Sequence, residues 1–124
     1  MPLSGYRILI VEDEALIALD LSYALEDLHA IVVGPVNNLA GARKLVSEGE
    51  IDCAVLDVHL GIESVAALLP ELDARHIPRV FMTAYPEQNL PKEWRVWPVL
   101  EKPMNRADLL RAIERVVEKR AGHD

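Results

Sequence analysis

Apolar residues in this chain alternate between short continuous runs and longer stretches with helical spacing. A short β-branched run that ends abruptly in polar residues is typical of a strand buried on both faces, as in a parallel sheet. Five runs of this kind predict strands over Tyr6–Val11, Ala30–Val33, Cys53–Leu56, Arg79–Thr83 and Val99–Leu100. We expect the second of them to end at Gly34-Pro35, where turn residues follow it.

Helical spacing follows four of these strands. Asn38, Ser64 and Asn105 each stand where a helix N-cap is expected, because their side-chain oxygens can accept from the first free backbone N–H groups. Pro70 falls inside the third helical pattern and predicts a kink or a break there. The first pattern places four apolar residues on one face, Ile17, Leu21, Leu25 and Leu28.

The segment between the fourth and fifth strands departs from this alternation. A fourth helix belongs there, but prolines at positions 86, 91 and 98 leave room for at most a turn or two between Pro91 and Trp97. We therefore expect the fourth helix to be short or disordered.

Alternating strands and helices predict an α/β domain, with a parallel sheet covered by helices on both faces in a three-layer sandwich. The 124 residues fit one domain spanning 1–124. The net charge of −7 argues against direct nucleic-acid binding, which needs a basic surface. No apolar run approaches membrane-spanning length, so we expect a cytoplasmic protein without membrane contact. Cys53 lies in an apolar run and is expected to be a buried, inert residue.

Polar residues stand where the predicted strands end. In a parallel sheet the functional crevice lies beyond the carboxyl ends of the strands. Taken singly, each residue has an ordinary structural alternative, such as a helix cap, an Asx turn or a solvated charge. Four of the five strand ends nevertheless carry chemistry-bearing residues, which predict one shared site made of Glu12, Asp13, Asp57, Thr83 and Lys102.

Several carboxylates at one sheet edge repel each other unless a hard cation sits among them. Mg²⁺, with Mn²⁺ as a possible substitute, prefers such oxygen ligands. We expect Asp13 and Asp57 to bind the ion directly, Glu12 through water, and the backbone carbonyl of His59 to complete the set. A carboxylate oxygen of Asp57 could then attack a phosphoryl donor. The Lys102 ammonium and the hydroxyl of Thr83 would stabilise the phosphoryl oxygens.

The chain resembles the receiver domain of bacterial two-component response regulators from about Arg7 to Glu118. The resemblance rests on four short pieces in the right order: Ile-Leu-Ile-Val-Glu-Asp-Glu (8–14), Leu-Asp-Val-His-Leu-Gly (56–61), Phe-Met-Thr-Ala (81–84) and Glu-Lys-Pro (101–103). It implies a flavodoxin-like (βα)5 fold with sheet order 2-1-3-4-5 and a cis bond between Lys102 and Pro103.

The resemblance also implies a function. Asp57 would accept a phosphoryl group from a histidine kinase or a histidine phosphotransfer protein, and the event would switch protein–protein contacts of a monomer or weak dimer. The chain would not be an enzyme beyond catalysing its own phosphorylation and dephosphorylation.

Two departures from the family pattern concern the relay of the signal. Receivers usually carry an aromatic switch residue on the fifth strand, where this chain has Val99. Residues 81–85 instead resemble a shortened Phe-Ala-Thr-Gly-x-Tyr motif of an alphaproteobacterial subgroup, with Ala84 replacing the glycine. Our hypothesis is that Tyr85 and the 84–97 loop carry the switch. His59 and Tyr85 flank the expected phosphoryl position and are candidates for tuning the phosphate lifetime.

Three other kinds of protein fit these residues less well. A phosphatase of the haloacid dehalogenase type needs a second acid two residues after the nucleophile, where this chain has His59. A nucleotide-binding domain needs a Gly-rich phosphate loop, which follows none of the strands. A pseudo-receiver that only binds partners would usually have lost one of the acids or the lysine.

Overall fold

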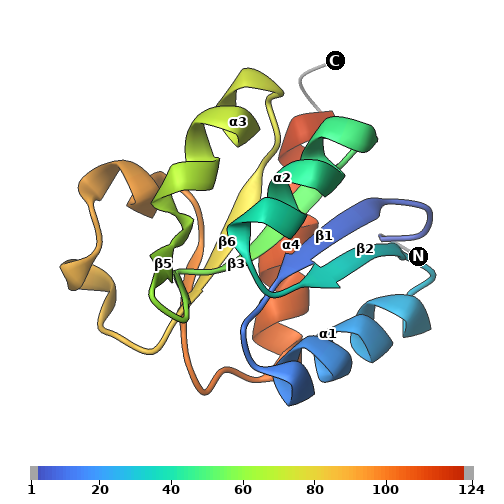
Figure 1. Ribbon diagram of the computed structural model, residues 1–124. Coiled ribbons are helices and arrows are strands. Elements are labelled where there is room, and N and C mark those ends of the chain that lie inside the picture. The colour runs from blue at the N-terminus through green and yellow to red at the C-terminus, as the bar shows by residue number, and fades with distance from the viewer. Residues whose placement is uncertain (1–2, 122–124) are drawn as a thin grey trace.

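The computed structural model describes residues 3–121, with side chains through Lys119. Its central sheet has five parallel strands in the order β2-β1-β3-β6-β7 (Figure 1). These strands span Arg7–Val11 (β1), Ile31–Val36 (β2), Cys53–Asp57 (β3), Arg79–Thr83 (β6) and Val99–Glu101 (β7). β4 and β5 form a separate hairpin, so β6 and β7 are the fourth and fifth strands of the central sheet. The predicted order 2-1-3-4-5 and the flavodoxin-like fold are therefore confirmed.

Helices cover both faces of this sheet (Figure 1). The α-helices are Ala15–Asp27 (α1), Leu39–Glu48 (α2), Leu69–Ala74 (α3) and Arg106–Ala121 (α4). Alternate residues of each strand face opposite cores, since successive side chains of a strand point to opposite sides. Ile8 and Ile10 pack with α1 and α4, whereas Leu9 and Val11 pack with α2 and the 65–72 segment.

The second strand continues beyond its predicted end. It runs through Gly34-Pro35 to Val36, and the prediction that it stops at this dipeptide is wrong. The Gly34-Pro35 bond is cis, and the pairing with β1 shifts between Leu9 and Val11. Gly34 has φ +92°, and a Cβ there would lie 3.0 Å from the Val36 nitrogen. Proline is tolerated because β2 is an edge strand, where one row of backbone groups needs no ladder partner.

The predicted caps and the break at Pro70 are present. Asn38 Oδ1 accepts from Gly41 N at 2.7 Å, and Asn105 Oδ1 accepts from Asp108 N at 2.7 Å. Ser64 Oγ accepts from Ala66 N at 3.2 Å at the start of a 3-10 turn, Val65–Leu68 (η1). The chain then continues as α3, with Pro70 in its first turn, where the missing N–H is no loss.

The segment between β6 and β7 forms two 3-10 turns, Glu87–Asn89 (η2) and Lys92–Val96 (η3). The expectation of a short fourth helix is therefore confirmed. The Trp94 ring stacks on Phe81 with centroids 5.2 Å apart, and the Arg79 guanidinium lies 5.0 Å from the Trp97 ring. The two tryptophans thus hold this segment against the sheet despite its lack of an α-helix.

A two-stranded hairpin, His59–Leu60 (β4) with Glu63–Ser64 (β5), follows β3 and was not predicted. Cys53 is buried, as expected. Within residues 3–121, every helix is too short or too polar to cross a bilayer.

Candidate phosphoacceptor site

The register of the sheet brings the predicted site residues to one edge. Val11 pairs with Leu56, Asp57 with Met82, and Thr83 with Glu101, so β1, β3, β6 and β7 end at nearly the same level. The polar residues that follow these strands therefore lie side by side at the carboxyl edge. This arrangement depends on strand pairing and on no local sequence signal.

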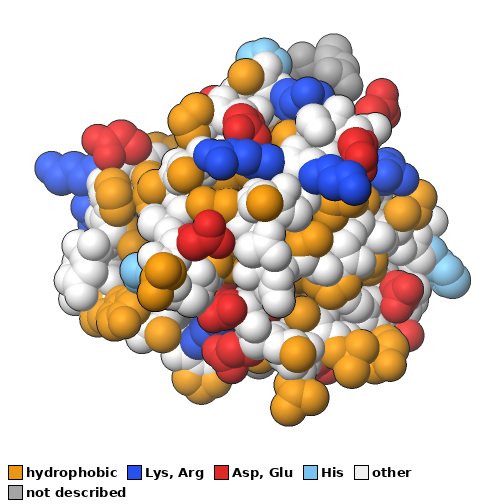
Figure 2. Space-filling view, viewed as in Figure 1, with side chains coloured by type: hydrophobic (Ala, Val, Ile, Leu, Met, Phe, Trp, Pro, Cys, Tyr) orange, Lys and Arg blue, Asp and Glu red, His pale blue; other side chains and the backbone are white. Residues whose placement is uncertain are grey.

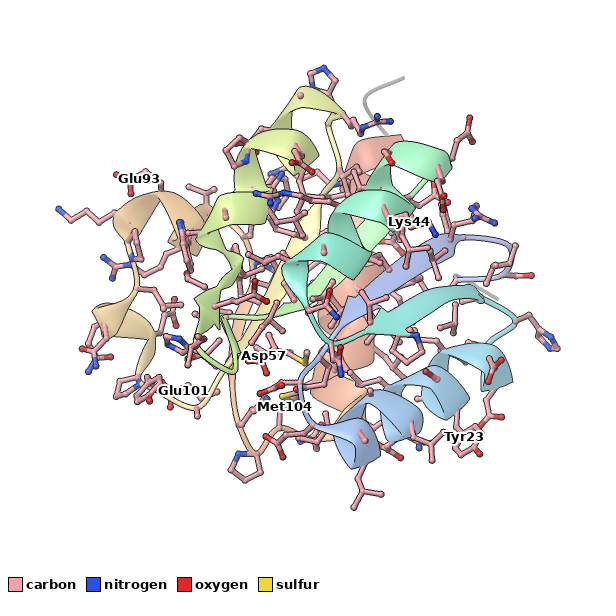
Figure 3. The ribbon with its side chains drawn as sticks, viewed as in Figure 1. Tyr23, Lys44, Asp57, Glu93, Glu101 and Met104 are labelled. Atoms are coloured by element: carbon pink, nitrogen blue, oxygen red, sulfur yellow. The ribbon has the colours of Figure 1, made fainter. Side chains whose placement is uncertain are left out.

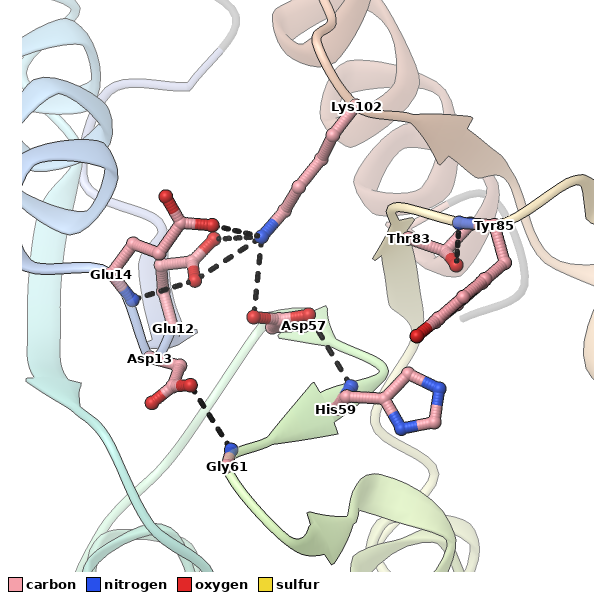
Figure 4. A network of polar contacts seen from close by, with 9 residues as sticks. All are labelled: Glu12, Asp13, Glu14, Asp57, His59, Gly61, Thr83, Tyr85 and Lys102. Atoms are coloured by element: carbon pink, nitrogen blue, oxygen red, sulfur yellow. Dashed lines mark hydrogen bonds and ion pairs between the residues drawn. The ribbon is translucent and has the colours of Figure 1, made fainter.

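The Lys102 ammonium lies at the centre of the site, among three carboxylates (Figure 4). Its Nζ is 2.9 Å from Glu12 Oε1 and 3.2 Å from Asp57 Oδ2. A longer contact of 3.5 Å joins it to Glu14 Oε1. Sequence reasoning missed Glu14, although the acidic run 12–14 was the available signal. The lysine comes from a position 90 residues beyond Glu12, just after β7.

Burial gives these contacts their electrostatic weight. The side chains of Glu12, Asp57 and Lys102 are only 0%, 9% and 13% exposed. Burial raises the pKa of Glu12, and the neighbouring Asp57 side chain raises it further. Burial opposes the charge on Lys102, but the hydrogen bond with Glu12 and the charge of Asp57 outweigh it and raise the pKa of Lys102. The pocket therefore favours cations and holds its lysine protonated.

Asp13 occupies a different position from the other two predicted acids. Its Oδ2 accepts a 3.0 Å hydrogen bond from Gly61 N, at the tip of the β4–β5 hairpin (Figure 4). Gly61 adopts φ +62°, a conformation that favours glycine. The same hairpin reaches Asp57, whose Oδ1 accepts from His59 N at 3.3 Å. The hairpin thus joins the two acidic loops of the site.

Thr83 and Tyr85 form the other side of the site. Thr83 is fully buried, and its Oγ1 accepts a 3.0 Å hydrogen bond from Tyr85 N. The Tyr85 ring is half-exposed and meets the His59 ring edge to face, with centroids 5.2 Å apart. The two residues predicted to flank the phosphoryl position are therefore in contact with each other. Ala84, between Thr83 and Tyr85, is exposed.

Val99 lies outside this polar network. It pairs with Phe81 across β6 and β7 and packs against the core on the α2–α3 side of the sheet. The Phe81 ring is stacked by Trp94 from the 3-10 segment. The aromatic packing near β7 therefore comes from the connection between β6 and β7.

The donor atoms of the site are suited to a hard divalent cation. Glu12, Asp13 and Asp57 supply carboxylate oxygens, which Mg²⁺ prefers. Glu12 Oε1 is buried and makes no well-directed hydrogen bond, although it lies 2.9 Å from the Lys102 ammonium. Among the described side chains, which end at Lys119, there is no ready-made cluster of three metal-binding groups. The residues fit the ion by chemistry, while Asp13 is turned toward Gly61 in this structure.

An open groove of about 500 Å³ leads to Lys102 between α1 and the 103–109 segment. Leu16, Ala84 and Met104 are among the side chains that line it. The Leu16 side chain is 82% exposed, so the groove has an apolar rim beside the buried charges.

The fold and this site together define a class: an α/β domain with carboxylates, a threonine and a lysine at the carboxyl edge of a flavodoxin-like sheet. The family model of the response regulator receiver domain matches residues 8–114. The chain belongs to this family, and two-component signalling is its functional context.

Individual relatives agree with this assignment. The chain is 37% identical over 93 residues to the phyllosphere-induced regulator PhyR of Methylorubrum extorquens, covering 70% of this chain and 34% of PhyR. The solution structure of SdrG from Sphingomonas melonis matches with 40% identity and a TM-score of 0.79, covering 94% of this chain and 98% of SdrG. The BeF3-activated conformation of SdrG from Pseudomonas melonis matches with 42% identity and a TM-score of 0.75, covering 90% and 98%. The chain thus spans about a third of PhyR and nearly all of the SdrG structures.

Proposed function

We propose that Asp57 accepts a phosphoryl group from a histidine kinase or a histidine phosphotransfer protein in a Mg²⁺-dependent reaction. The observation that carries this proposal is the 3.2 Å contact between Asp57 Oδ2 and the Lys102 ammonium at the carboxyl edge of the sheet. A carboxylate oxygen of Asp57 forms a bond to phosphorus. The phosphorus–nitrogen bond of the donor breaks, and its electron pair returns to the donor imidazole.

The cation site of this proposal consists of Glu12, Asp13, Asp57 and the backbone carbonyl of His59. When bound, Mg²⁺ or Mn²⁺ supplies positive charge that screens the carboxylates from the phosphoryl oxygens. Glu12 and Asp57 are the buried acids of the set, and Asp13 would exchange its hydrogen bond with Gly61 for the ion.

Lys102 and Thr83 stabilise the phosphoryl group. The ammonium already lies within 3.2 Å of Asp57, so it is placed to follow the oxygens of the transferring group. The Thr83 hydroxyl accepts from Tyr85 N and retains its own proton to donate. The hydroxyl would have to turn in order to donate to a phosphoryl oxygen. Because Tyr85 N is bonded to the same oxygen, the backbone of residues 83–85 would move with it.

The groove beside Lys102 supports an approach route for the donor. Its apolar rim at Leu16 and Met104 allows a partner side chain to lose water before it reaches the buried carboxylates. A phosphohistidine imidazole is a compact leaving group that such an opening can admit.

The switch in this proposal consists of Tyr85, Ala84 and the 84–97 segment, with Val99 in place of the usual aromatic residue. The contact between Tyr85 and His59 gives these two side chains a role in setting the phosphate lifetime, because the His59 backbone N–H binds Asp57 and the Tyr85 ring packs against the His59 ring. The similarity to SdrG, which has been solved in a BeF3-activated conformation, supports a conformational response to phosphorylation.

The remaining parts of the proposal concern the chain as a whole. Residues 1–124 act as a single receiver domain in the cytoplasm, as a monomer or weak dimer. The output is a change in protein–protein contacts, with no direct binding of nucleic acid or membrane. The chain turns over only its own aspartyl phosphate.

Incubation with acetyl phosphate and Mg²⁺, followed by intact-mass measurement, tests the phosphoacceptor. We expect a gain of one phosphoryl group in the wild type and in the surface control Asp27→Asn, and no gain in Asp57→Asn. Phosphorylation that persists in Asp57→Asn, or that is unaffected by chelation of the metal, would disprove the proposal.

Beryllofluoride binding tests the switch. We expect the amide resonances of residues 83–97 to shift in the presence of Mg²⁺ and beryllofluoride. Tyr85→Ala should retain binding at Asp57 while losing part of these shifts. An unchanged 83–97 segment with a responding surface elsewhere would contradict this assignment.

A further inference from the structure

A second groove, of about 560 Å³, lies between α2 and α3, on the opposite face of the sheet from α1 and α4. Figure 2 shows Lys and Arg side chains over these two helices, with Asp and Glu side chains between them. In Figure 3, Lys44 lies on α2, well apart from Asp57 at the sheet edge. The groove is lined by Ala40, Arg43, Lys44, Val46, Ser47, Glu71, Ala74 and Arg75. The phosphoacceptor site uses none of these residues.

Part of the groove is lined by small side chains. Ala40 and Ser47 stand seven residues apart on α2, and Ala74 faces them from α3. Residues at this spacing share one side of a helix, and Arg43 and Lys44, which lie between them on that side, add the longer side chains of the groove. The side-chain ridge of a partner helix can pack against these small side chains between α2 and α3, with Arg43 and Lys44 beside it.

Arg43 is fixed within the groove by its own contacts. Its Nε lies 2.9 Å from Glu71 Oε1, and its Nη2 donates to Ala67 O at 3.1 Å. A guanidinium has five donors in a rigid plane, and the Arg43 side chain is 47% exposed. A further carboxylate can therefore reach its remaining donors, in the same chemistry that already joins it to Glu71.

The charge of the groove is opposite to that of the protein. Arg43, Lys44 and Arg75 outnumber Glu71, while the whole chain carries a net charge of −7. Polyanions such as nucleic acid or an anionic membrane are repelled by the rest of the surface. A short acidic segment meets mainly the local positive field, because charges further away than about 10 Å are screened at 0.1 M salt.

From these observations we infer that the α2–α3 groove binds an acidic helix of a partner protein, with carboxylates spaced three or four residues apart. The occupant is a helix because the groove is an open trough between two helices, which does not enclose a small anion. Binding here leaves the phosphoacceptor edge free, so the inference does not depend on the proposed phosphorylation of Asp57.

The test uses NMR titration of the ¹⁵N-labelled chain with a helical peptide that carries glutamates on one face. The peptide is about 16 residues long, because shorter isolated helices are marginal in water. A peptide with glutamine at each glutamate position and inorganic phosphate are titrated separately. We expect shifts of the 40–47 and 71–75 amides with the glutamate peptide and none with the glutamine peptide.

Two matched charge reversals locate the binding. Lys44→Glu/Arg75→Glu removes the exposed cations of the groove and leaves the Arg43–Glu71 pair in place. Arg115→Glu/Lys119→Glu makes the same change in net charge on α4. We expect affinity for the glutamate peptide to fall about ten-fold in the first variant, since two attractive pairs become repulsive, and to change much less in the second.

Several results would overturn the inference. They are equal losses of peptide affinity in both variants, amide shifts spread over all basic regions of the chain, or no amide shift at millimolar peptide. Saturation of the groove amides by inorganic phosphate, with no response to the glutamate peptide, would identify a small-anion site instead of a helix-binding surface.

Discussion

Replacing Lys102 by methionine tests the electrostatic account of the site most directly. The ammonium lies 2.9 Å from Glu12 and 3.2 Å from Asp57, and all three side chains are at least 87% buried. At an effective dielectric constant of about 20, each of these contacts contributes roughly 5–6 kcal/mol of Coulomb attraction before desolvation is subtracted. Removing one partner leaves buried carboxylates without compensation, which typically costs about 3–5 kcal/mol.

We therefore expect Lys102→Met to lower the free energy of unfolding by about 3 kcal/mol at pH 7 in EDTA. Urea unfolding followed by the fluorescence of Trp94 and Trp97 measures this difference. Lys92→Met is the control, because an exposed lysine should change stability by no more than about 0.5 kcal/mol.

The dependence on pH separates charge from packing. Burial and Asp57 already raise the pKa of Glu12 above 4.5, and loss of the ammonium raises it further. An acid whose pKa is raised by folding binds its proton more readily in the folded state. The stability gained from that proton is fully present below pH 4.5 and is lost as the pH rises through the folded pKa. The deficit of Lys102→Met should therefore shrink as the pH falls from 7 toward 4.5.

A second substitution completes this test. Adding Glu12→Gln to Lys102→Met removes one uncompensated charge and should recover part of the lost stability at pH 7. A deficit below about 0.5 kcal/mol would refute the electrostatic account. So would a deficit that is independent of pH, or one that Glu12→Gln deepens.

Three further predictions concern other parts of the chain. Adding Mg²⁺ should shift the Gly61 amide resonance, since Asp13 gives up its hydrogen bond to bind the ion; an unchanged Gly61 signal at saturation would contradict this. Asn105→Ala should lower the free energy of unfolding in urea by about 1 kcal/mol through loss of the α4 cap, whereas a neutral effect would argue against the cap. Trp94→Ala should expose Phe81 and destabilise the chain by about 2 kcal/mol, which urea unfolding followed by circular dichroism measures; a loss under about 0.5 kcal/mol would show that the stacking is unimportant.

The local features of the fold could be predicted because they depend on neighbours in the chain. Apolar runs marked all five sheet strands, and the side chains of Asn38 and Asn105 cap the helices that follow them. The prolines between β6 and β7 excluded a regular fourth helix in both the sequence and the structure. The end of β2 was predicted wrongly because a cis Gly34-Pro35 bond within an edge strand resembles a turn in sequence.

The site was predictable only in part. The residue types at the strand ends indicated carboxylate and lysine chemistry at one edge. Their actual contacts depend on strand register, which places Lys102 beside a carboxylate 90 residues away. The same dependence explains why the contact of Glu14 with Lys102 was missed, and why the hydrogen bond between Asp13 and Gly61 could not be foreseen.

The sequence by itself determined the elements, the class of sheet and the residue types at its carboxyl edge, because periodicity, capping and proline geometry act over a few residues. Only the tertiary structure decided how buried Glu12 is, which charges surround Lys102, how the β4–β5 hairpin holds Asp13, and that α2 and α3 leave a basic groove between them. Burial and ion-pair geometry arise from segments distant in sequence, and they set the energies on which the chemistry of this site depends.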